Sequence, residues 1–89
     1  MIKTRGIVVT EIRPTARGWR GRTADGRPLC VRVGNNYVTI FMGTPRGDFW
    51  SAVEGEPLLR AYFGGGAFTY KELRRLTEGL LELPEREVK

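Results

Sequence analysis

Apolar and polar residues alternate along much of the first half of the chain, which is typical of half-buried β-strands. The pattern predicts four strands, at Arg5–Arg13, Trp19–Thr23, Leu29–Val33 and Tyr37–Met42. The first is rich in β-branched residues and is expected to stop at Pro14, because proline cannot donate a hydrogen bond to a neighbouring strand. We therefore expect this half of the chain to form a β-sheet of antiparallel strands.

The two strands around Asn35-Asn36 have a register that follows from the pattern. A two-residue turn at these asparagines is reasonable, because asparagine tolerates the positive φ that such a turn needs. The opposed pairs are then Val33 with Val38, Val31 with Ile40, and Leu29 with Met42. All six apolar side chains share one face in this register, so it is the expected one.

The preceding hairpin, around Asp25-Gly26, is compatible with two registers. A two-residue turn would place Arg20 and Arg22 on the apolar face, whereas a three-residue loop, Asp25-Gly26-Arg27, turns them outward with Arg32. Burying two unpaired arginines costs far more than a bulge, so the three-residue loop is expected. It places Arg20 directly opposite Arg32. Like charges at opposed positions are mildly destabilising, which hints that this face meets something negative.

The segment between residues 49 and 63 has two readings. Phe49–Glu54 and Pro57–Phe63 are expected to form a hairpin across Gly55-Glu56, since glycine at the first turn position suits a type II′ turn. The alternative is a short helix that has Pro57 in its first turn. The strands are favoured, because a run of three glycines follows directly.

The last element is predicted to be an amphipathic helix. Thr69 is a suitable N-cap, and Glu72 three residues later completes a capping box. The apolar positions at helical spacing are Leu73, Leu76, Leu80 and Leu83. Gly79 is expected to weaken the helix interior, and Pro84 is expected to end the helix.

These elements predict a single domain of 89 residues in the α+β class. Residues 1–63 are expected to be mainly β, residues 69–83 helical, and residues 84–89 a frayed tail. The β part is a small twisted antiparallel sheet or an SH3-like or OB-like barrel of about four to six strands, followed by one C-terminal amphipathic helix. Because so short a chain buries little surface, we expect a homodimer that covers its excess aromatic side chains. Those side chains are Tyr37, Phe41, Trp50 and Phe63.

Charge is distributed unevenly along the chain. Residues 1–47 carry a net charge of +7 and residues 48–89 a net charge of −2. Twelve of the fifteen basic residues are arginine, whose planar guanidinium group suits phosphate or carboxylate recognition. The candidate nucleic-acid-binding residues are Arg13, Arg17, Arg20, Arg22, Arg27 and Arg32. Trp19 lies among them, as a base-stacking platform or as a core residue. Tyr37 and Phe41 are expected on the outer face, as a platform, inside a closed barrel, or under the helix.

The residue content excludes several kinds of site. The chain has no histidine and one cysteine, Cys30, which excludes the usual zinc sites and the histidine-dependent catalytic triads. No catalytic residue, metal or cofactor is expected. The chain shows no signal-peptide pattern and no apolar run long enough to cross a membrane, and a lone cysteine fits a reducing compartment. The expected location is cytoplasmic, without a membrane partner.

The basic first half favours a small, non-enzymatic nucleic-acid-binding module that neutralises phosphates with weak sequence preference. The alternative is a protein-interaction module, such as an adaptor or inhibitor carried by a phage or mobile element. Its basic face would then meet an acidic partner. Salt dependence separates the two, because a phosphate binder loses affinity log-linearly with salt on unrelated nucleic-acid sequences.

A third hypothesis, an RNA-cleaving enzyme, comes from a local resemblance. The segments Arg5-Gly6-Ile7-Val8-Val9, Pro14-Thr15 and Gly26-Arg27-Pro28-Leu29 resemble the opening of MazF/Kid-type toxin ribonucleases. The resemblance implies an SH3-like barrel with a C-terminal helix that cleaves RNA without histidine. Arg27 matches an arginine that contributes to catalysis in that family. The resemblance covers about a quarter of the chain, and an inserted stretch at Trp19–Asp25 departs from the family's spacing.

Overall fold

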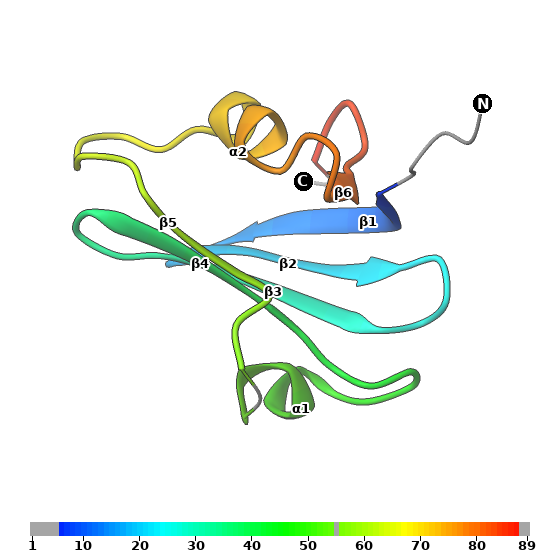
Figure 1. The fold of residues 1–89 in the computed structure, drawn as a ribbon. Coiled ribbons are helices and arrows are strands. Elements are labelled where there is room, and N and C mark those ends of the chain that lie inside the picture. Colours follow the sequence, from blue (N-terminus) through cyan, green and yellow to red (C-terminus); the bar gives the residue numbers. More distant parts are fainter. Residues whose placement is uncertain (1–5, 55, 88–89) are drawn as a thin grey trace.

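The structure, a computed structural model, describes residues 6–54 and 56–87 (Figure 1). The elements in chain order are β1 (Ile7–Thr15), β2 (Gly18–Thr23), β3 (Pro28–Val33), β4 (Tyr37–Met42), α1 (Phe49–Glu54), β5 (Leu59–Tyr62), α2 (Tyr70–Leu76) and β6 (Leu81–Glu82). Three expectations fall outside the described residues: the first strand's start at Arg5, the turn position Gly55, and the last two residues of the tail. The four strands expected in the first half are present.

The six strands form one mixed sheet in the order β5-β4-β3-β2-β1-β6. Strands β1 to β5 are antiparallel to their neighbours, whereas β6 pairs with β1 in parallel. The sheet curls into a half-barrel, with α2 over one face and α1 under the other (Figure 1). This architecture agrees with a small, barrel-like α+β fold. It corrects two expectations, because the sheet is not purely antiparallel and a strand follows the C-terminal helix.

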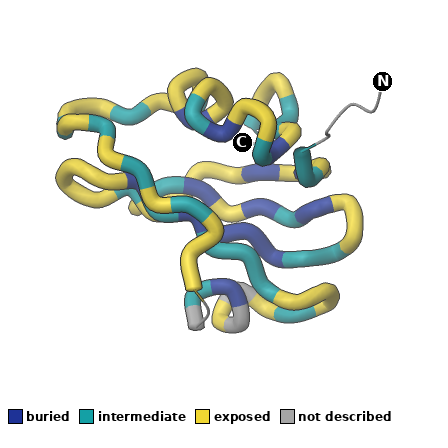
Figure 2. Tube along the Cα trace, in the orientation of Figure 1, coloured by how far each residue is buried: buried dark blue, intermediate teal, exposed yellow. Residues whose placement is uncertain are grey.

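One face of the sheet carries the hydrophobic core, which α2 and β6 cover. Its buried residues are Val9, Ile12, Trp19, Leu29, Val31, Val38, Ile40, Leu73 and Leu81. In Figure 2, buried segments (dark blue) recur along the central strands of the sheet. Val9 and Ile12 lie three residues apart in one strand, yet both reach the core, because a β-bulge between Val9 and Glu11 shifts the register. The same bulge turns Glu11 and Arg13 to the opposite face.

β1 also continues through Pro14, where the sequence predicted its end. Beyond Ile7 and Val8, which pair with β6, the outer side of β1 has no neighbouring strand among the described residues. Proline is tolerated on such an edge, because its missing N–H faces away from the ladder.

The register between β3 and β4 is the expected one. The pairs are Leu29 with Met42, Cys30 with Phe41, Val31 with Ile40, Arg32 with Thr39, and Val33 with Val38. The Gly34 N–H donates to the Tyr37 carbonyl oxygen at 2.8 Å, which closes the turn over Asn35 and Asn36. Arg32 therefore points away from the core, as predicted.

The register between β2 and β3 differs from the predicted one by two residues. The pairs are Gly18 with Arg32, Trp19 with Val31, Arg20 with Cys30, Gly21 with Leu29, and Arg22 with Pro28. The loop is Ala24-Asp25-Gly26, in which Gly26 takes a φ of 85° that favours glycine. The predicted opposition of Arg20 and Arg32 is therefore wrong. A shift of two residues keeps every side chain on its face, so both arginines still point outward.

The segment after β4 forms a helix and a strand instead of the predicted hairpin. Phe49–Glu54 is the short helix α1, which packs on β3 and β4 with Ala52 fully buried. Leu59–Tyr62 is a strand, as favoured, but it pairs with β4. The alternative helix with Pro57 in its first turn is also wrong. A helix-start signal was present, since Asp48 directly precedes α1 and aspartate is a preferred N-cap residue.

The C-terminal helix is shorter than the predicted 69–83, because α2 ends at Leu76. Gly79 has a φ of 86°, the left-handed conformation that is common just beyond a helix C-terminus. Gly79 therefore lies beyond the end of the helix, and it does not weaken the helix interior as predicted. Leu81 is buried in β6, where it pairs with Ile7 of β1. Leu80 and Leu81 still contact the core, Leu80 from the turn after α2 and Leu81 from β6.

Thr69 caps α2 as the sequence predicts. Its hydroxyl oxygen accepts from the Glu72 N–H at 3.3 Å, and the Glu72 carboxylate accepts from the Thr69 N–H at 3.4 Å. Thr69→Ala should lower the free energy of unfolding by about 1 kcal/mol, because a first-turn N–H loses its acceptor. Urea denaturation checks this: the midpoint should fall at constant slope, and an unchanged midpoint would contradict the capping role.

The tail after β6 contacts the core as far as the structure describes it, up to residue 87. The Tyr70 hydroxyl donates to the Pro84 carbonyl oxygen at 2.6 Å, and the Trp19 indole N–H donates to a Glu87 carboxylate oxygen at 2.5 Å. Trp19 is 7% exposed, and its ring packs against Phe68 and Tyr70. Trp19 is therefore a core residue and not a base-stacking platform.

Candidate nucleic-acid interface

The face of the sheet opposite the core carries exposed arginines from several strands. The members are Arg13 of β1, Arg20 of β2, Arg32 of β3, Arg60 of β5, and Arg17 in the turn between β1 and β2. We call these five residues the arginine face. Strand alternation places the four strand members there, because residues next to them, such as Trp19 and Leu59, take the core side. Arg17 is included because it lines the same hollow as Arg32 and Arg60. Side chains from distant parts of the chain thus meet on one surface.

The strand registers bring members of the arginine face close together. Arg13 lies directly opposite Arg20, where side chains begin about 5 Å apart. Arg32 lies opposite Thr39, which in turn lies opposite Arg60, so Arg32 and Arg60 share one row two strands apart. Neighbouring strands are about 4.8 Å apart, which puts the backbones of these two arginines roughly 10 Å apart. The like-charge opposition predicted for Arg20 and Arg32 is found at Arg13 and Arg20.

Three of the arginines surround a hollow of about 380 Å³. Arg17, Arg32 and Arg60 line it together with Tyr37 and the turn at Asn35 and Asn36. None of the described lining residues is acidic. Three guanidinium groups around an open hollow favour an anion, and phosphate suits arginine because it can accept two parallel hydrogen bonds.

A second hollow, of about 240 Å³, lies next to the first. Its lining includes Arg20, Arg32, Asp48 and Trp50. Arg32 lines both hollows, so together they form one path across the arginine face. Asp48 places a carboxylate at this end, which makes the second hollow less positive than the first.

Two exposed aromatic side chains, Trp50 and Tyr37, line these hollows, and a third, Tyr62, lies beside Tyr37. Trp50 is 71% exposed, Tyr62 66% and Tyr37 44%. The Arg60 guanidinium lies over the Tyr37 ring, 4.7 Å from its centroid, and the Tyr62 ring meets the Tyr37 ring edge-on at 5.4 Å. The arginine face therefore combines cations with accessible aromatic rings, the combination that single-stranded nucleic acids require.

The middle of this face is covered by α1, which packs on β3 and β4. Cys30 is buried and Phe41, directly opposite it, is half-buried. Of the outward aromatics expected from the sequence, Tyr37 is thus exposed and Phe41 is not. A short helix earlier in the chain, and not the C-terminal helix, covers part of the outer face.

Arg22 lines a hollow with Arg13 and Arg20, but it differs from them in its contacts. It is half-buried, and its Nη1 atom donates to the Gly26 carbonyl oxygen at 2.9 Å and to the Gly47 carbonyl oxygen at 3.4 Å. These bonds connect the β2–β3 loop to the loop before α1. The guanidinium of this candidate residue therefore stabilises two loops.

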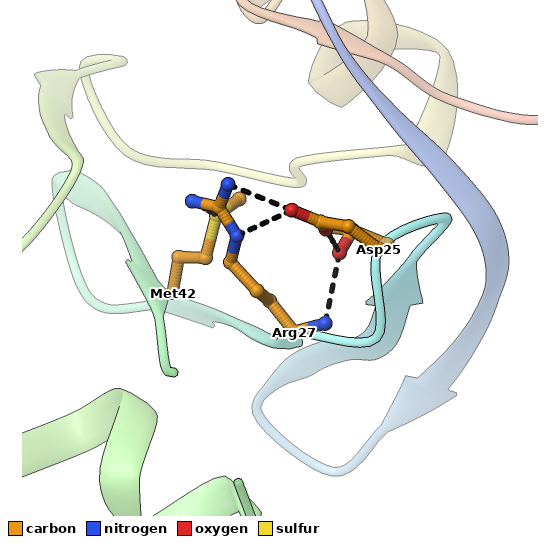
Figure 3. Close-up of polar contacts among 4 residues, drawn as sticks. Asp25, Arg27 and Met42 are labelled. Atoms are coloured by element: carbon orange, nitrogen blue, oxygen red, sulfur yellow. Dashed lines mark hydrogen bonds and ion pairs between the residues drawn. The ribbon is translucent and has the colours of Figure 1, made fainter. Parts of the chain in front are cut away.

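Arg27, another candidate residue, forms an ion pair within its own loop. Figure 3 shows its guanidinium against the Asp25 carboxylate, with Nε and Nη2 each 2.7 Å from Oδ2, and Nη1 is 3.7 Å from the Met42 sulfur. Met42 lies on the core side of β4, so Arg27 points away from the arginine face. The Thr23 hydroxyl, which donates to Asp25, and then Arg27 lower the pKa of Asp25 below its usual value. The charge of Arg27 is therefore largely balanced locally.

A hollow of about 500 Å³ beside α2 is less suited to an anion, because Glu78 and Glu82 balance the charge of the Arg74 and Arg75 that line it with them. Within residues 6–54 and 56–87, no group of three or more histidine, cysteine, aspartate or glutamate residues is arranged to hold a metal ion. The same residues include no helix long and apolar enough to span a membrane.

No protein-family model, curated protein or solved structure matches this chain. The resemblance to MazF/Kid-type ribonucleases therefore rests on the short segments quoted above. Its one proposed functional residue, Arg27, is engaged with Asp25.

Sequence reasoning did not select Arg60, Trp50 and Tyr62 as candidate residues, although they lie on or beside the arginine face. Arg60 alternates with Leu59 and Ala61 in a predicted strand, so it was accessible to the same argument that placed Arg32 outward. The sequence pattern predicts a strand at Trp50, whereas the structure places this residue in α1. Only its position in the helix leaves the side chain exposed. Tyr62 depends on the pairing of β5 with β4, which no local pattern specifies.

Proposed function

We propose that this protein is a small, non-enzymatic nucleic-acid-binding module whose arginine face neutralises backbone phosphates. One observation carries the proposal: five exposed arginines, from four strands and a turn, lie on a single face opposite the core. Each guanidinium that contacts a phosphate releases condensed counterions, and this release is the main source of sequence-independent affinity.

The pairing of Arg13 with Arg20 supports an anionic ligand. The two arginines line a hollow of about 280 Å³ together with Arg22 and Glu11, so three cations face one carboxylate there. The Arg17–Arg32–Arg60 hollow offers a second phosphate position, because its described lining carries three cations and no acid.

Arginine contacts to phosphate carry little sequence information, so we expect weak sequence preference. A cytoplasmic location belongs to the same proposal, because Cys30 is a free, buried thiol and nucleic acid is abundant there. No catalytic residue is assigned.

Salt dependence tests the proposal. A fluorescently labelled random-sequence oligonucleotide, followed by anisotropy, should bind with a slope of log K against log salt of roughly −3 to −4 for about five phosphate contacts. Affinity should then fall by about a hundredfold between about 50 mM and about 200 mM salt. Unrelated sequences should give the same slope. Absence of binding at about 50 mM salt would contradict the proposal.

An acidic protein partner is the second candidate. Trp50, Tyr62 and the five arginines are the residue types that dominate protein–protein interfaces, and they lie together here. This candidate predicts specific binding to one acidic surface and no general affinity for unrelated oligonucleotides. The anisotropy titration above therefore separates the two.

Dimer formation remains a prediction from the sequence. The expectation was based on four aromatic side chains. Phe63 packs on Phe68 beside the core and Phe41 is half-buried, so only Tyr37 and Trp50 of the four are exposed. Both line hollows of the arginine face, so bound nucleic acid and a second copy compete for the same surface. Sedimentation with and without oligonucleotide distinguishes these occupants.

A further inference from the structure

We infer that the ligand of the arginine face is single-stranded nucleic acid, with bases stacked on Trp50 and on Tyr62; this inference rests on the proposed function. Arginines alone do not select a single strand over a duplex, since both present phosphates. The exposed aromatic rings decide between them.

Trp50 is displayed by the geometry of α1. Successive residues of a helix are about 100° apart, so Trp50 lies on roughly the opposite side of α1 from Ala52. Ala52 is fully buried against the sheet, which leaves the Trp50 ring 71% exposed. The ring nevertheless forms a wall of the hollow that Arg20 and Arg32 line. A flat aromatic surface thus stands beside two cations.

Tyr62 provides a second aromatic surface next to Tyr37, which lines the hollow at Arg17 and Arg60. It lies opposite Tyr37 on the last strand of the sheet, and the two rings meet edge-on. The face of Tyr37 is occupied by the Arg60 guanidinium, so Tyr37 supports the site and Tyr62 offers the freer ring. Arg60 thereby holds a cation close to Tyr62.

Arg32 connects the two ends, because it lines both the hollow at Trp50 and the hollow at Arg17 and Arg60. A strand that stacks one base on Trp50 and another on Tyr62 places its intervening phosphates over these arginines. In a duplex, the bases already stack on one another and their faces are inaccessible. Only an unpaired strand satisfies the arginines and the aromatic rings together.

Tryptophan fluorescence tests this inference directly. The chain has two tryptophans, and only Trp50 is exposed, whereas Trp19 is buried and bonded to Glu87. An oligothymidylate or an oligouridylate of about twelve nucleotides should quench the emission of Trp50 by stacking on it. A duplex of the same length should bind at least about tenfold more weakly and without quenching.

Two variants distinguish the contribution of base stacking to binding from the contribution of charge. Trp50→Ala should weaken single-strand binding by roughly tenfold and leave duplex binding unchanged. Trp50→Phe keeps an aromatic face, so it should bind nearly as the parent does while the quenching disappears. Both substitutions change an exposed side chain and keep the net charge, and circular dichroism verifies that the fold is intact.

The outcomes are distinguishable. Quenching by single strands with weaker duplex binding supports the inference. Equal binding of both forms without quenching overturns it and leaves the proposed function standing, since phosphates alone then explain the affinity. Absence of binding to either form at low salt overturns both.

Discussion

Gly18→Ala should destabilise the protein more than any other single glycine-to-alanine change in β2 or its flanking turns. Gly18 has a φ of 150°, and a Cβ atom there would lie 2.0 Å from the Val31 carbonyl oxygen and 2.9 Å from its carbonyl carbon. Neither contact is tolerable, and both partners are backbone atoms of the neighbouring strand. We expect the free energy of unfolding to fall by about 3 kcal/mol and Tm by roughly 15 °C.

Gly18→Ala should also disturb the arginine face, because Gly18 pairs with Arg32. The close approach of β2 and β3 at this point sets the register that keeps Trp19 in the core and Arg20 outside. Thermal unfolding followed by circular dichroism measures the effect.

Gly34→Ala is the matched control. Its φ lies outside the left-handed region, and an added Cβ would lie 3.5 Å from the Tyr37 carbonyl oxygen, an ordinary contact. Its stability should change by less than about 0.5 kcal/mol. Equal Tm values for the two variants would mean that the close approach at Gly18 does not determine the register.

Side-chain alternation was the most informative part of the sequence. It placed Arg20 and Arg32 on the outer face correctly, although the loop between β2 and β3 begins and ends one residue earlier than predicted. The reason is the period of two: a register error of two residues changes the partners of a side chain but not its face. The β3–β4 register was predicted in full, because three apolar pairs agreed on it.

Features that depend on long-range contacts were not predictable in this way. The β-bulge in β1 is stabilised by both Val9 and Ile12 reaching the core, which the local pattern does not specify. The parallel pairing of β6 with β1 joins the two ends of the chain. A Cβ on Gly6 would lie 2.8 Å from the Leu80 carbonyl group, so the glycine permits this approach, but its partner is known only from the fold.

The candidate site was predictable in part for the same reason. Four of its six predicted arginines, Arg13, Arg17, Arg20 and Arg32, lie on the arginine face. Arg22 and Arg27 bind loop carbonyl oxygens and Asp25 instead, because both flank a turn whose polar groups require partners. Charge counting cannot separate an arginine that stabilises a turn from one that is available to a ligand.

Reversing the charge of Arg17 and Arg32 together should abolish most nucleic-acid binding. Both side chains are exposed and line the same hollow, and Arg32 faces Gly18 and Thr39 across the neighbouring strands, so glutamate fits without loss of packing. Two phosphate contacts become two repulsions. We expect at least about a hundredfold weaker binding at about 50 mM salt, and a salt slope smaller in magnitude by about 1.5.

Arg74→Glu with Arg75→Glu is the matched control, because it changes the net charge by the same amount. These arginines lie on α2, beside a hollow where Glu78 and Glu82 already balance them. Binding should weaken by less than about fivefold, since only the long-range field changes, and that field is screened beyond about 10 Å.

The direct comparison of these two double variants, by anisotropy with the same random-sequence oligonucleotide and at equal salt, tests the central claim. If the arginine face is the binding surface, the Arg17→Glu, Arg32→Glu protein loses binding while the α2 variant retains it. Equal losses would show that affinity depends on net charge alone. A larger loss for the α2 variant would place the interface on the other side of the molecule.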